Sequence, residues 1–335
     1  MKIVLSICIA TYNRAGFIGQ TLESIIPQLE EGVELLVVDG ASPDSTEEVV
    51  RRYQIQCPQL RYVRLSAKGG VDQDYDRAVE LAEGEYCWLF TDDDLLKPGA
   101  VAAVKAAIKK GYDLVIVNAE VRDRDLSGIL VRRRISMQEN RAYAPNSREH
   151  LFVDALYYLS FIGAVVIRRS IWLSRERRLY FGTEFVHVGV IFQKSLPGPA
   201  LIIAEPYIII RLGNAQWTIR NFDIWMFKWP KLVWSFMDIP NKAKLSITPK
   251  EPWRNFKTLI IQRSEGSYNL RCYNQYLSTL RLNVLWKSCA LLIACFPRKI
   301  IFGCHYLYCQ IKGPEVRALF NIHFKKQGGN LHAPD

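Results

Sequence analysis

The first 120 residues predict an α/β fold with a mainly parallel, doubly wound sheet. Short apolar runs that suit buried strands alternate there with segments whose apolar residues recur at helical spacing. Repeated strand–helix units of this kind build parallel sheets with helices on both faces. The chain has 335 residues, of which 49% are hydrophobic and 23% charged, so it can bury a large core.

The predicted strands are short and strongly apolar. The first is an almost continuous apolar run, as expected for a strand buried on both faces. In chain order, the strands are expected at 4–10, 33–38, 60–65, 86–90 and 114–118.

Predicted helices separate these strands. An apolar stripe follows the first strand from Phe17 to Leu29, and Ser42-Pro43-Asp44-Ser45 after the second is typical of a helix start. Two further helices are expected at 71–81 and 99–109. The following region is less regular, with a helix expected at 147–159 and strands at 161–167 and 201–211.

The charge distribution divides the chain in two. The net charge is +11, yet residues 1–220 carry equal numbers of basic and acidic side chains, so the whole surplus lies in 221–335. In that tail, aromatic and basic residues interleave with aliphatic ones at helical spacing. We expect a catalytic domain at 1–220 and a basic helical region at 221–335.

Several classes of protein are disfavoured by what the sequence lacks. It contains no G-x-x-x-x-G-K-[ST] phosphate loop, no G-x-G-x-x-G and no C-x-x-C pair, which argues against a P-loop enzyme, a dinucleotide enzyme and a zinc site. No uncharged apolar segment reaches the length of a membrane-spanning helix. Lys2 leads directly into the first strand, so we expect no signal peptide and a cytoplasmic protein with reduced cysteines.

Polar side chains stand where three of the predicted strands end. Thr11-Tyr12-Asn13-Arg14 follows the first strand, Asp39 the second, and Asp92-Asp93-Asp94 the fourth. In open α/β sheets, ligands bind beyond the carboxyl ends of the strands, so we expect these residues to share one site. Asp39 would accept hydrogen bonds from a base or ribose there, or would simply belong to a turn.

The three adjacent aspartates are the sharpest of these signals. Their charges repel one another strongly unless a cation neutralises them. Carboxylate oxygens suit Mg²⁺ or Mn²⁺, which commonly bind one or two carboxylates together with substrate phosphates. An acidic turn at the N-terminus of the next helix is the simpler alternative.

Three motifs together resemble the family 2 glycosyltransferases of the GT-A fold. They are 6–14 (SICIATYNR), 36–46 (LVVDGASPDST) and 84–94 (GEYCWLFTDDD), in matching order and spacing. The resemblance implies a Rossmann-like GT-A sheet flanked by helices and a nucleoside-diphosphate sugar as donor.

The resemblance also implies roles for individual residues. It makes Asp92-x-Asp94 the metal-binding D-x-D element for Mn²⁺ or Mg²⁺, with Asp93 beside the donor sugar. The metal would stabilise the leaving diphosphate as a Lewis acid. The residues implied around the nucleoside are Thr11, Tyr12, Arg14 and Asp39.

A narrower likeness is to the abequosyltransferase-like enzymes of O-antigen assembly. It depends on 68–76 (KGGVDQDYD), the Thr-Asp-Asp-Asp run and 211–217 (RLGNAQW). It implies a deoxyhexose or dideoxyhexose donor and a lipid-linked acceptor. Gly70 would let the backbone approach the donor, and Asp74 would lie beside it; a flexible loop and a helix cap are the alternatives.

An inverting transfer also needs a base that removes the proton of the acceptor hydroxyl. The family usually supplies an Asp or Glu about 100 residues after the metal motif, often in an acidic pair. Here the corresponding stretch, Gly182-Thr183-Glu184-Phe185-Val186-His187, has a single acid. We expect Glu184 to be the base and His187 to contact metal, phosphate or acceptor. The alternatives are a surface carboxylate and a core histidine, and the single acid leaves the stereochemical outcome open.

Two further features point to the acceptor side. Gln216, Trp217 and Arg220 follow a predicted strand and would clamp acceptor or diphosphate, although Trp217 would equally suit packing between lobes. Aromatic and basic residues at 225–236 and 281–299 suit a membrane interface, so we expect the tail to attach the protein to anionic lipid at the inner face of the cell membrane. A helical lobe with a solvated basic face is the alternative.

The sequence therefore predicts a metal-dependent glycosyltransferase of surface polysaccharide or O-antigen synthesis that acts on a glycan or lipid-linked acceptor. A nucleotidyltransferase is disfavoured, because the loop after the first strand is poor in glycine and basic residues. A non-catalytic membrane-associated scaffold is disfavoured by the intact Asp92-x-Asp94. No nucleic-acid-binding motif accompanies the basic tail. The donor base, sugar, linkage and oligomeric state stay open.

Overall fold

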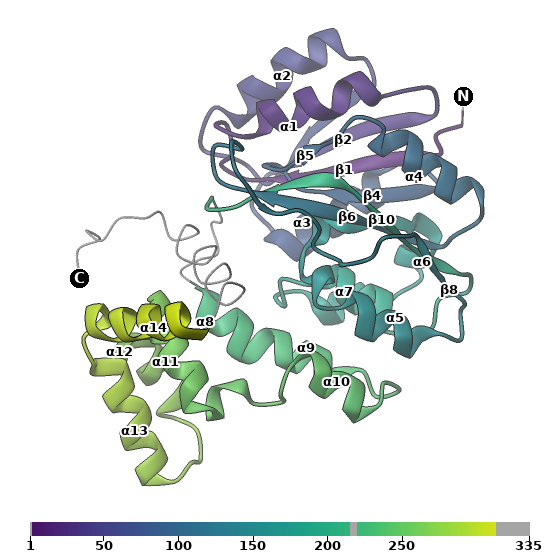
Figure 1. The fold of residues 1–335 in the computed structure, drawn as a ribbon. Coiled ribbons are helices and arrows are strands. Elements are labelled where there is room, and N and C mark those ends of the chain that lie inside the picture. The colour runs from purple at the N-terminus through teal and green to yellow at the C-terminus, as the bar shows by residue number, and fades with distance from the viewer. Residues whose placement is uncertain (1, 215–219, 313–335) are drawn as a thin grey trace. The chain divides into compact units, whose positions relative to one another are not determined.

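A ten-stranded sheet organises the N-terminal part of the chain (Figure 1). The structure is a computed structural model, and it describes residues 2–214 and 220–312. The strands are β1 (Leu5–Thr11), β2 (Val33–Asp39), β3 (Leu60–Arg64), β4 (Tyr86–Phe90), β5 (Leu95–Leu96), β6 (Leu114–Arg122), β7 (Ile129–Val131), β8 (Arg141–Tyr143), β9 (Val165–Arg168) and β10 (Ala200–Arg211).

The topology of this sheet is mainly parallel. Its order is β3-β2-β1-β4-β9-β6-β10-β5, with β7 beside β6 and β8 beside β10. The first four strands form one parallel block, and β6 and β10 form a second parallel pair. β9 lies antiparallel between β4 and β6 and joins the two blocks. The predicted α/β fold with a mainly parallel sheet is confirmed.

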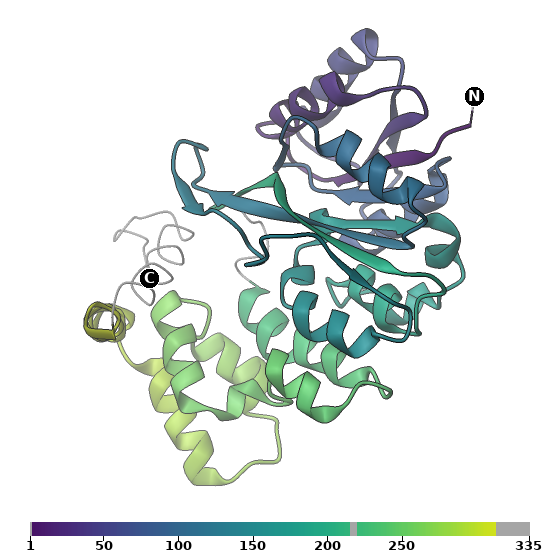
Figure 2. The same cartoon turned by 45° about the vertical axis from the view of Figure 1, so that its right-hand side comes forward.

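Helices cover both faces of the sheet. α1, α2 and α4 lie on one face, and α3 and α6 lie on the other (Figures 1 and 2). The helices that belong to this part of the chain are α1 (Ile18–Ile25), α2 (Thr46–Gln56), α3 (Val71–Leu81), α4 (Ala100–Lys109), α5 (Arg148–Ala155), α6 (Arg169–Leu173), α7 (Val186–Phe192) and α10 (Asn241–Ile247).

The strand predicted at 161–167 is shorter than expected. A 3₁₀ turn at Ile162–Ala164 occupies its first part, another at Tyr158–Ser160 precedes it, and β9 begins only at Val165. The ring of Phe161 folds back onto Gly163, where a Cβ atom would lie 2.4 Å from the ring. The carbonyl of Gly163 accepts a hydrogen bond of 2.9 Å from the indole of Trp88. This packing requires a turn at Ile162–Ala164, although the apolar composition of 161–167 alone suggests a strand.

The chain separates into two compact units. The first unit comprises Met1–Arg211 and Phe236–Ile247, and the second comprises Leu212–Ser235 and Thr248–Asp335. The predicted boundary after residue 220 therefore differs by nine residues, and α10 returns to the first unit. The reason is aromatic packing, because the Phe236 ring lies 6.2 Å from that of Phe152 in the first unit. The roles predicted for the two regions stay predictions.

The second unit is helical and has a hydrophobic core of its own. Its Phe222 and Tyr268 rings stack at 4.8 Å, and the Tyr268 hydroxyl donates a hydrogen bond of 3.0 Å to the carbonyl of Ala290. The helices of this unit are α8 (Asn221–Asp223), α9 (Trp229–Ser235), α11 (Phe256–Glu265), α12 (Leu270–Cys272), α13 (Val284–Cys295) and α14 (Arg298–Lys312).

The aromatic residues near the start of the tail face inward. Trp229 and Phe236 are buried, and Phe227 packs against the hydrophobic core of the second unit. This packing does not favour the predicted membrane contact of segment 225–236. Among the described residues, no helix combines the length and apolar character needed to cross a bilayer.

Gly189 in α7 allows the packing of this helix against Tyr180 to be tested. A Cβ atom at this position would lie 2.1 Å from Cγ of the buried Tyr180, so Gly189→Ala forces the ring to move. We expect the free energy of unfolding to fall by about 1–3 kcal/mol. Chemical denaturation measures this loss.

Gly16→Ala is the matched control, because no atom lies within 4 Å of its added Cβ. Its unfolding midpoint should equal that of the wild type. Equal midpoints for the two variants would contradict the tight packing of α7.

Candidate active site

The predicted site residues converge where β1 and β4 end. These strands are parallel neighbours, with Ile9 opposite Phe90, so the loops that follow them leave the sheet at the same edge. The Arg14 guanidinium lies 3.3 Å from Asp92 and 3.2 Å from Asp93, measured from Nε and Nη2 to the carboxylate oxygens. The structure thus brings the first and third sequence motifs together in one ion-pair cluster.

The aspartates of this cluster have little access to water. Burial raises the pKa of Asp92 to about 7, the charge of Asp93 adds to the increase, and Arg14 opposes it. Burial and Asp93 also raise the pKa of Asp94 well above its usual range. Burial and mutual repulsion both disfavour the ionised forms of these three carboxyl groups. A further positive charge beside them would therefore stabilise the ionised forms.

Asp94 also ties the acidic cluster to the end of β10. Its two carboxylate oxygens accept hydrogen bonds of 2.7 Å from the backbone N–H of Arg211 and 2.5 Å from the hydroxyl of Thr91. The Arg211 guanidinium donates to the carbonyl of Asp93 at 3.0 Å and to the side chain of Gln20 at 2.5 Å. Arg211 was not among the predicted site residues. A lone arginine that ends a long apolar strand was the signal available in the sequence.

Asp39 lies at the neighbouring strand end and is completely buried. One carboxylate oxygen accepts the backbone N–H and hydroxyl of Ser42, at 2.8 and 2.6 Å. The other accepts the hydroxyl of Tyr62 at 2.6 Å and Nη1 of Arg64 at 3.2 Å. The carboxylate is therefore fixed in orientation by hydrogen bonds on both oxygens. Its predicted contact with a base or ribose stays a prediction.

The loop before α3 adds a second group of predicted residues beside Asp39. Asp74 accepts a hydrogen bond of 3.1 Å from the N–H of Gly69, and a Cβ on Gly40 would lie 3.0 Å from its other oxygen. Gly70 has a φ of 94°, which glycine adopts without strain. The ammonium of Lys68 lies 3.5 Å from the ring centroid of Tyr12. A cation and a flat aromatic face thus meet near the end of β1.

Glu184 is held in place by Asp72, an aspartate that was not among the predicted site residues. The two carboxylate oxygens of Asp72, in the first turn of α3, accept the backbone N–H groups of Glu184 at 2.8 Å and Val186 at 2.9 Å. Burial raises the pKa of Asp72 to about 6, and the charge of Glu184 raises it further, while the two N–H groups oppose the shift. The partners are more than 100 residues apart in sequence, so no local pattern reveals the contact.

Glu184 itself has an unusual backbone. Its φ is 72°, in the left-handed region that non-glycine residues seldom occupy, and its side chain is half-buried. Such positions persist where the surrounding contacts determine them, as Asp72 does here. The role of general base stays a prediction.

The remaining predicted contacts have different positions. His187 is 1% exposed, its Nε2 lies 2.6 Å from the carbonyl of Leu159, and burial lowers its pKa to about 4. A contact of His187 with ligand stays a prediction, and the burial favours a structural role. Arg220 precedes α8 in the second unit. Gln216 and Trp217 lie outside the described residues.

The acidic cluster suits a divalent cation whose remaining coordination positions are filled by a bound phosphate ligand. Asp92, Asp93 and Asp94 supply hard carboxylate oxygens, as Mg²⁺ and Mn²⁺ prefer. Within 2–214 and 220–312, no group of three or more His, Cys, Asp or Glu side chains has the geometry of a complete metal site. Mg²⁺ is commonly bound by one or two carboxylates with phosphate oxygens, so the residues present fit such a metal.

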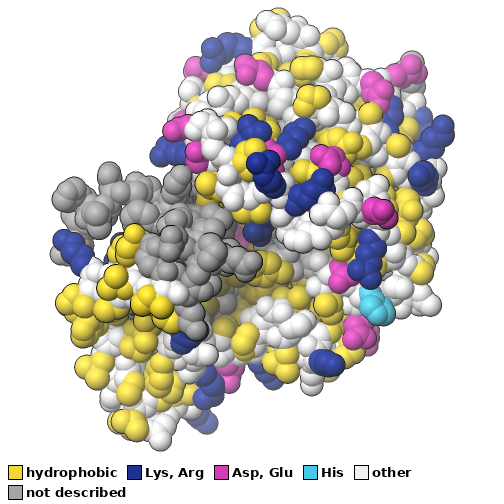
Figure 3. All heavy atoms as spheres, in the orientation of Figure 1, with side chains coloured by type: hydrophobic (Ala, Val, Ile, Leu, Met, Phe, Trp, Pro, Cys, Tyr) yellow, Lys and Arg dark blue, Asp and Glu magenta, His cyan; other side chains and the backbone are white. Residues whose placement is uncertain are grey.

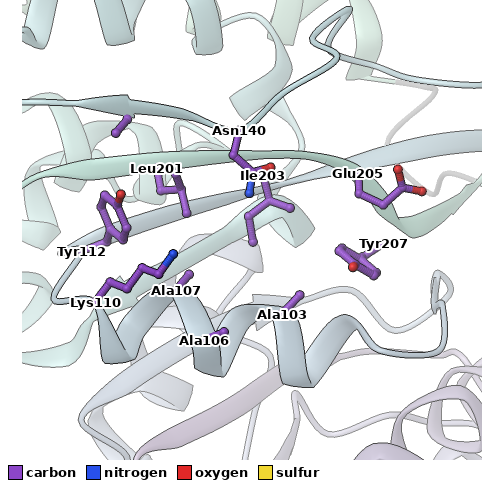
Figure 4. Close-up of a pocket in the computed structure, with 11 residues that line it drawn as sticks. Ala103, Ala106, Ala107, Lys110, Tyr112, Asn140, Leu201, Ile203, Glu205 and Tyr207 are labelled. Atoms are coloured by element: carbon purple, nitrogen blue, oxygen red, sulfur yellow. The ribbon is translucent and has the colours of Figure 1, made fainter.

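A hollow of about 340 Å³ lies elsewhere in the first unit, between α4 and β10 (Figure 4). Ala103 and Ala107 of α4 face Leu201 and Ile203 of β10, and Tyr207 stands at one end. None of the predicted site residues lines this hollow, so it is separate from the acidic cluster.

Comparison with known proteins identifies the family. The model of Glycosyl transferase family 2 matches residues 6–171, which contain all three motifs and the acidic cluster. Abequosyltransferase RfbV of Salmonella typhimurium is 28% identical over 229 residues, which span 63% of this chain and 67% of that protein. The chain thus covers about two thirds of this relative's length.

Solved structures show the same fold. S. aureus TarS 1–349 in complex with UDP has a TM-score of 0.59 at 15% identity and covers 98% of this chain and 91% of its own. Mannosyltransferase PcManGT from Pyrobaculum calidifontis in complex with GDP-Man and Mn²⁺ has a TM-score of 0.52 at 16% identity, over 97% and 85% of the two chains. The GT-A fold predicted from the motifs is confirmed, and residues 6–171 form a domain of glycosyltransferase family 2.

Proposed function

We propose that this chain transfers a sugar from a nucleoside-diphosphate donor to a glycan or lipid-linked acceptor, in the synthesis of a surface polysaccharide such as an O-antigen. The observation that carries the proposal is the ion-pair cluster of Arg14 with Asp92 and Asp93, next to the oriented carboxylate of Asp39. The likeness to an enzyme named abequosyltransferase supports a deoxyhexose or dideoxyhexose as the transferred sugar.

The donor's nucleoside would bind at the ends of β1 and β2. Asp39, whose carboxylate Ser42, Tyr62 and Arg64 hold in place, would accept a hydrogen bond from the base or ribose. The ring of Tyr12 would offer a flat face to the base, while Gly70 would let the backbone come close to the donor. Thr11 and Asp74 would border the same site.

The diphosphate would bind at the acidic cluster. Asp92 and Asp94 would hold Mn²⁺ or Mg²⁺ there, and Asp93 would lie beside the donor sugar. When bound, the metal would stabilise the negative charge that develops on the leaving diphosphate. Arg14 already lies between Asp92 and Asp93, so it would supply a second, permanent positive charge near the diphosphate.

Glu184 would take the proton of the acceptor hydroxyl. A general base must sit within hydrogen-bonding distance of that proton, so its position has to be fixed to a fraction of an ångström. The two hydrogen bonds from the backbone of Glu184 and Val186 to Asp72 fix the peptide that carries this carboxylate. His187, Gln216, Trp217 and Arg220 are kept as proposed contacts of the acceptor or diphosphate.

A lipid-linked acceptor would bring the enzyme to a membrane surface. The surplus of basic residues lies in the tail, which suits attraction to anionic lipid. We therefore place the protein in the cytoplasm, peripherally attached to the inner face of the cell membrane.

The first prediction from the proposed function concerns donor binding. The wild type should bind one member of a panel of nucleoside diphosphates at least about tenfold more tightly with Mn²⁺ than with a chelator, because Asp92 and Asp94 would hold the cation and its charge would attract the phosphates. Asp94→Asn should remove most of this difference. Isothermal titration calorimetry measures both.

Asp94 also accepts structural hydrogen bonds, so the fold of this variant needs a check by circular dichroism and melting temperature. Asp154→Asn, a carboxylate of the first unit that lies outside the cluster, is the control. If the folded wild type bound no nucleotide in a metal-dependent way, the metal-dependent transferase would be refuted.

The second prediction concerns the base. Glu184→Gln removes the proton acceptor while it keeps shape and hydrogen-bonding capacity, so kcat should fall by about 10²–10⁴-fold with unchanged nucleotide binding. Release of nucleoside diphosphate in the presence of a lipid-linked glycan extract measures turnover. Glu149→Gln, an exposed carboxylate of α5, should leave kcat unchanged. Near-normal turnover by Glu184→Gln would assign the base elsewhere.

The third prediction separates positioning from chemistry. In Asp72→Asn, one amide oxygen can accept only one of the two N–H groups, and the NH₂ group faces the other, so the Glu184 peptide loses part of its support. We expect kcat to fall about tenfold, less than in Glu184→Gln, with donor affinity unchanged. An equal loss in donor affinity would indicate a general structural role for Asp72.

A further inference from the structure

The second unit exposes an unusual amount of apolar surface. In Figure 3, hydrophobic side chains gather over α13 and α14, with basic groups among them. Soluble proteins seldom leave large apolar patches in water, and such patches mark interaction sites. The exposed large apolar side chains of the two helices and the residue between them are Val284, Leu285, Leu292, Phe296, Ile300, Tyr306, Leu307, Tyr308 and Ile311.

On α13, the outward face is as apolar as the inward one. Leu285, Leu292 and Phe296 follow one another at intervals of seven and four residues, so they share one face of the helix. The opposite face meets the core of the unit through the fully buried Ala290 and Ala294. A helix that is apolar on all sides normally has a partner on each of them.

α14 repeats this arrangement. Ile300, Leu307 and Ile311 recur at the same intervals of seven and four residues, and Ile311 is 84% exposed. The inward face packs on α11, where the His305 ring and the Ser264 hydroxyl share a hydrogen bond of 2.7 Å. The exposed stripe is therefore an outward face of the folded unit.

The charged side chains of α13, of α14 and of the stretch that leads to them all have one sign. Between residues 266 and 312 the chain contains no aspartate or glutamate. A surface with basic charges and apolar stripes, bordered by Tyr306 and Tyr308, has the composition of an interfacial membrane segment. The basic residues of this stretch are Arg271, Arg281, Lys287, Arg298, Lys299 and Lys312.

We propose that the exposed stripes of α13 and α14 insert into the headgroup region of an anionic bilayer, while the surrounding lysines and arginines bind lipid phosphates. This inference extends the proposed membrane attachment by naming the surface that binds lipid. It assigns no lipid contact to segment 225–236, because most of the aromatic rings there pack in hydrophobic cores. It does not depend on the proposed transfer reaction.

Charge complementarity favours lipid over two other occupants. A second copy of the chain would place this basic surface against an identical one, so like charges would meet. Residues 313–335 carry three basic and two acidic side chains, which offers little complement to six basic residues. An anionic bilayer satisfies both the apolar stripes and the positive charge.

The test is co-sedimentation of the full chain with vesicles of phosphatidylcholine, either alone or with about one third phosphatidylglycerol. The apolar variant combines Leu285→Ser, Leu292→Ser and Leu307→Ser, all at exposed positions that should tolerate the change. The charge variant combines Arg281→Gln and Lys299→Gln. The matched control combines Ile55→Ser and Leu179→Ser, two apolar side chains of the first unit that are 85% and 71% exposed.

We expect the wild type and the matched control to bind the anionic vesicles equally well, and neutral ones weakly. The apolar variant should bind at least about tenfold more weakly, and the charge variant should lose affinity and salt dependence. Equal vesicle binding by the apolar variant and the wild type would overturn the proposal.

Light scattering could instead show that the wild type is a dimer and the apolar variant a monomer, while the two bind vesicles equally. That result would also overturn the proposal and assign the surface to a second copy. If deletion of residues 313–335 alone strengthened vesicle binding relative to the full chain, the result would support the proposal, because the surface of α13 and α14 would then be shown to accept lipid. Nucleotide binding by the apolar variant should equal that of the wild type, so failure of this inference stays distinct from failure of the proposed catalysis.

Discussion

The first unit depends on the charge balance around three consecutive aspartates that follow β4. Two arginines from distant parts of the chain meet there. Arg14 follows β1 and pairs with Asp92 and Asp93, and Arg211 ends β10 and donates to the backbone of Asp93. Both guanidinium groups lie over the ring of Phe17, at 5.6 and 5.4 Å. The two guanidinium groups therefore hold the strand ends together. They also offset the free-energy cost of burying the negative charge of the aspartates.

Strained backbone marks the loops that meet at this edge of the sheet. Asn13, Ala41 and Glu184 have φ values of 58°, 63° and 72°, each a conformation that costs non-glycine residues about 1–2 kcal/mol. Side chains from other segments hold these loops, since the Ser42 hydroxyl accepts the N–H of Asn13 at 2.9 Å and Asp72 accepts that of Glu184. Strain that is supported in this way fixes loop positions before a ligand binds.

The sequence predicts the parts of this site that local pattern determines. Apolar runs locate β1, β2 and β4, and parallel pairing then brings Arg14, Asp39 and the aspartates of 92–94 to one edge. The contact of Asp72 with the Glu184 loop has no such signature, because it joins residues 112 apart and depends on how α7 packs. For the same reason, the burial of His187 follows from tertiary packing and not from its neighbours in sequence.

The tail shows the limit of composition most clearly. Segments 225–236 and 281–299 both combine aromatic, aliphatic and basic residues, yet they lie in different surroundings. The first turns its large rings inward, with Trp229 and Phe236 buried, whereas α13 fully buries only Ala290 and Ala294. Trp286, Leu291 and Ile293 pack partly against the core, but Leu285 and Leu292 are 73% and 68% exposed, which reverses the usual order of a water-soluble protein. That reversal makes sense if the outward side of α13 does not face water when the protein works.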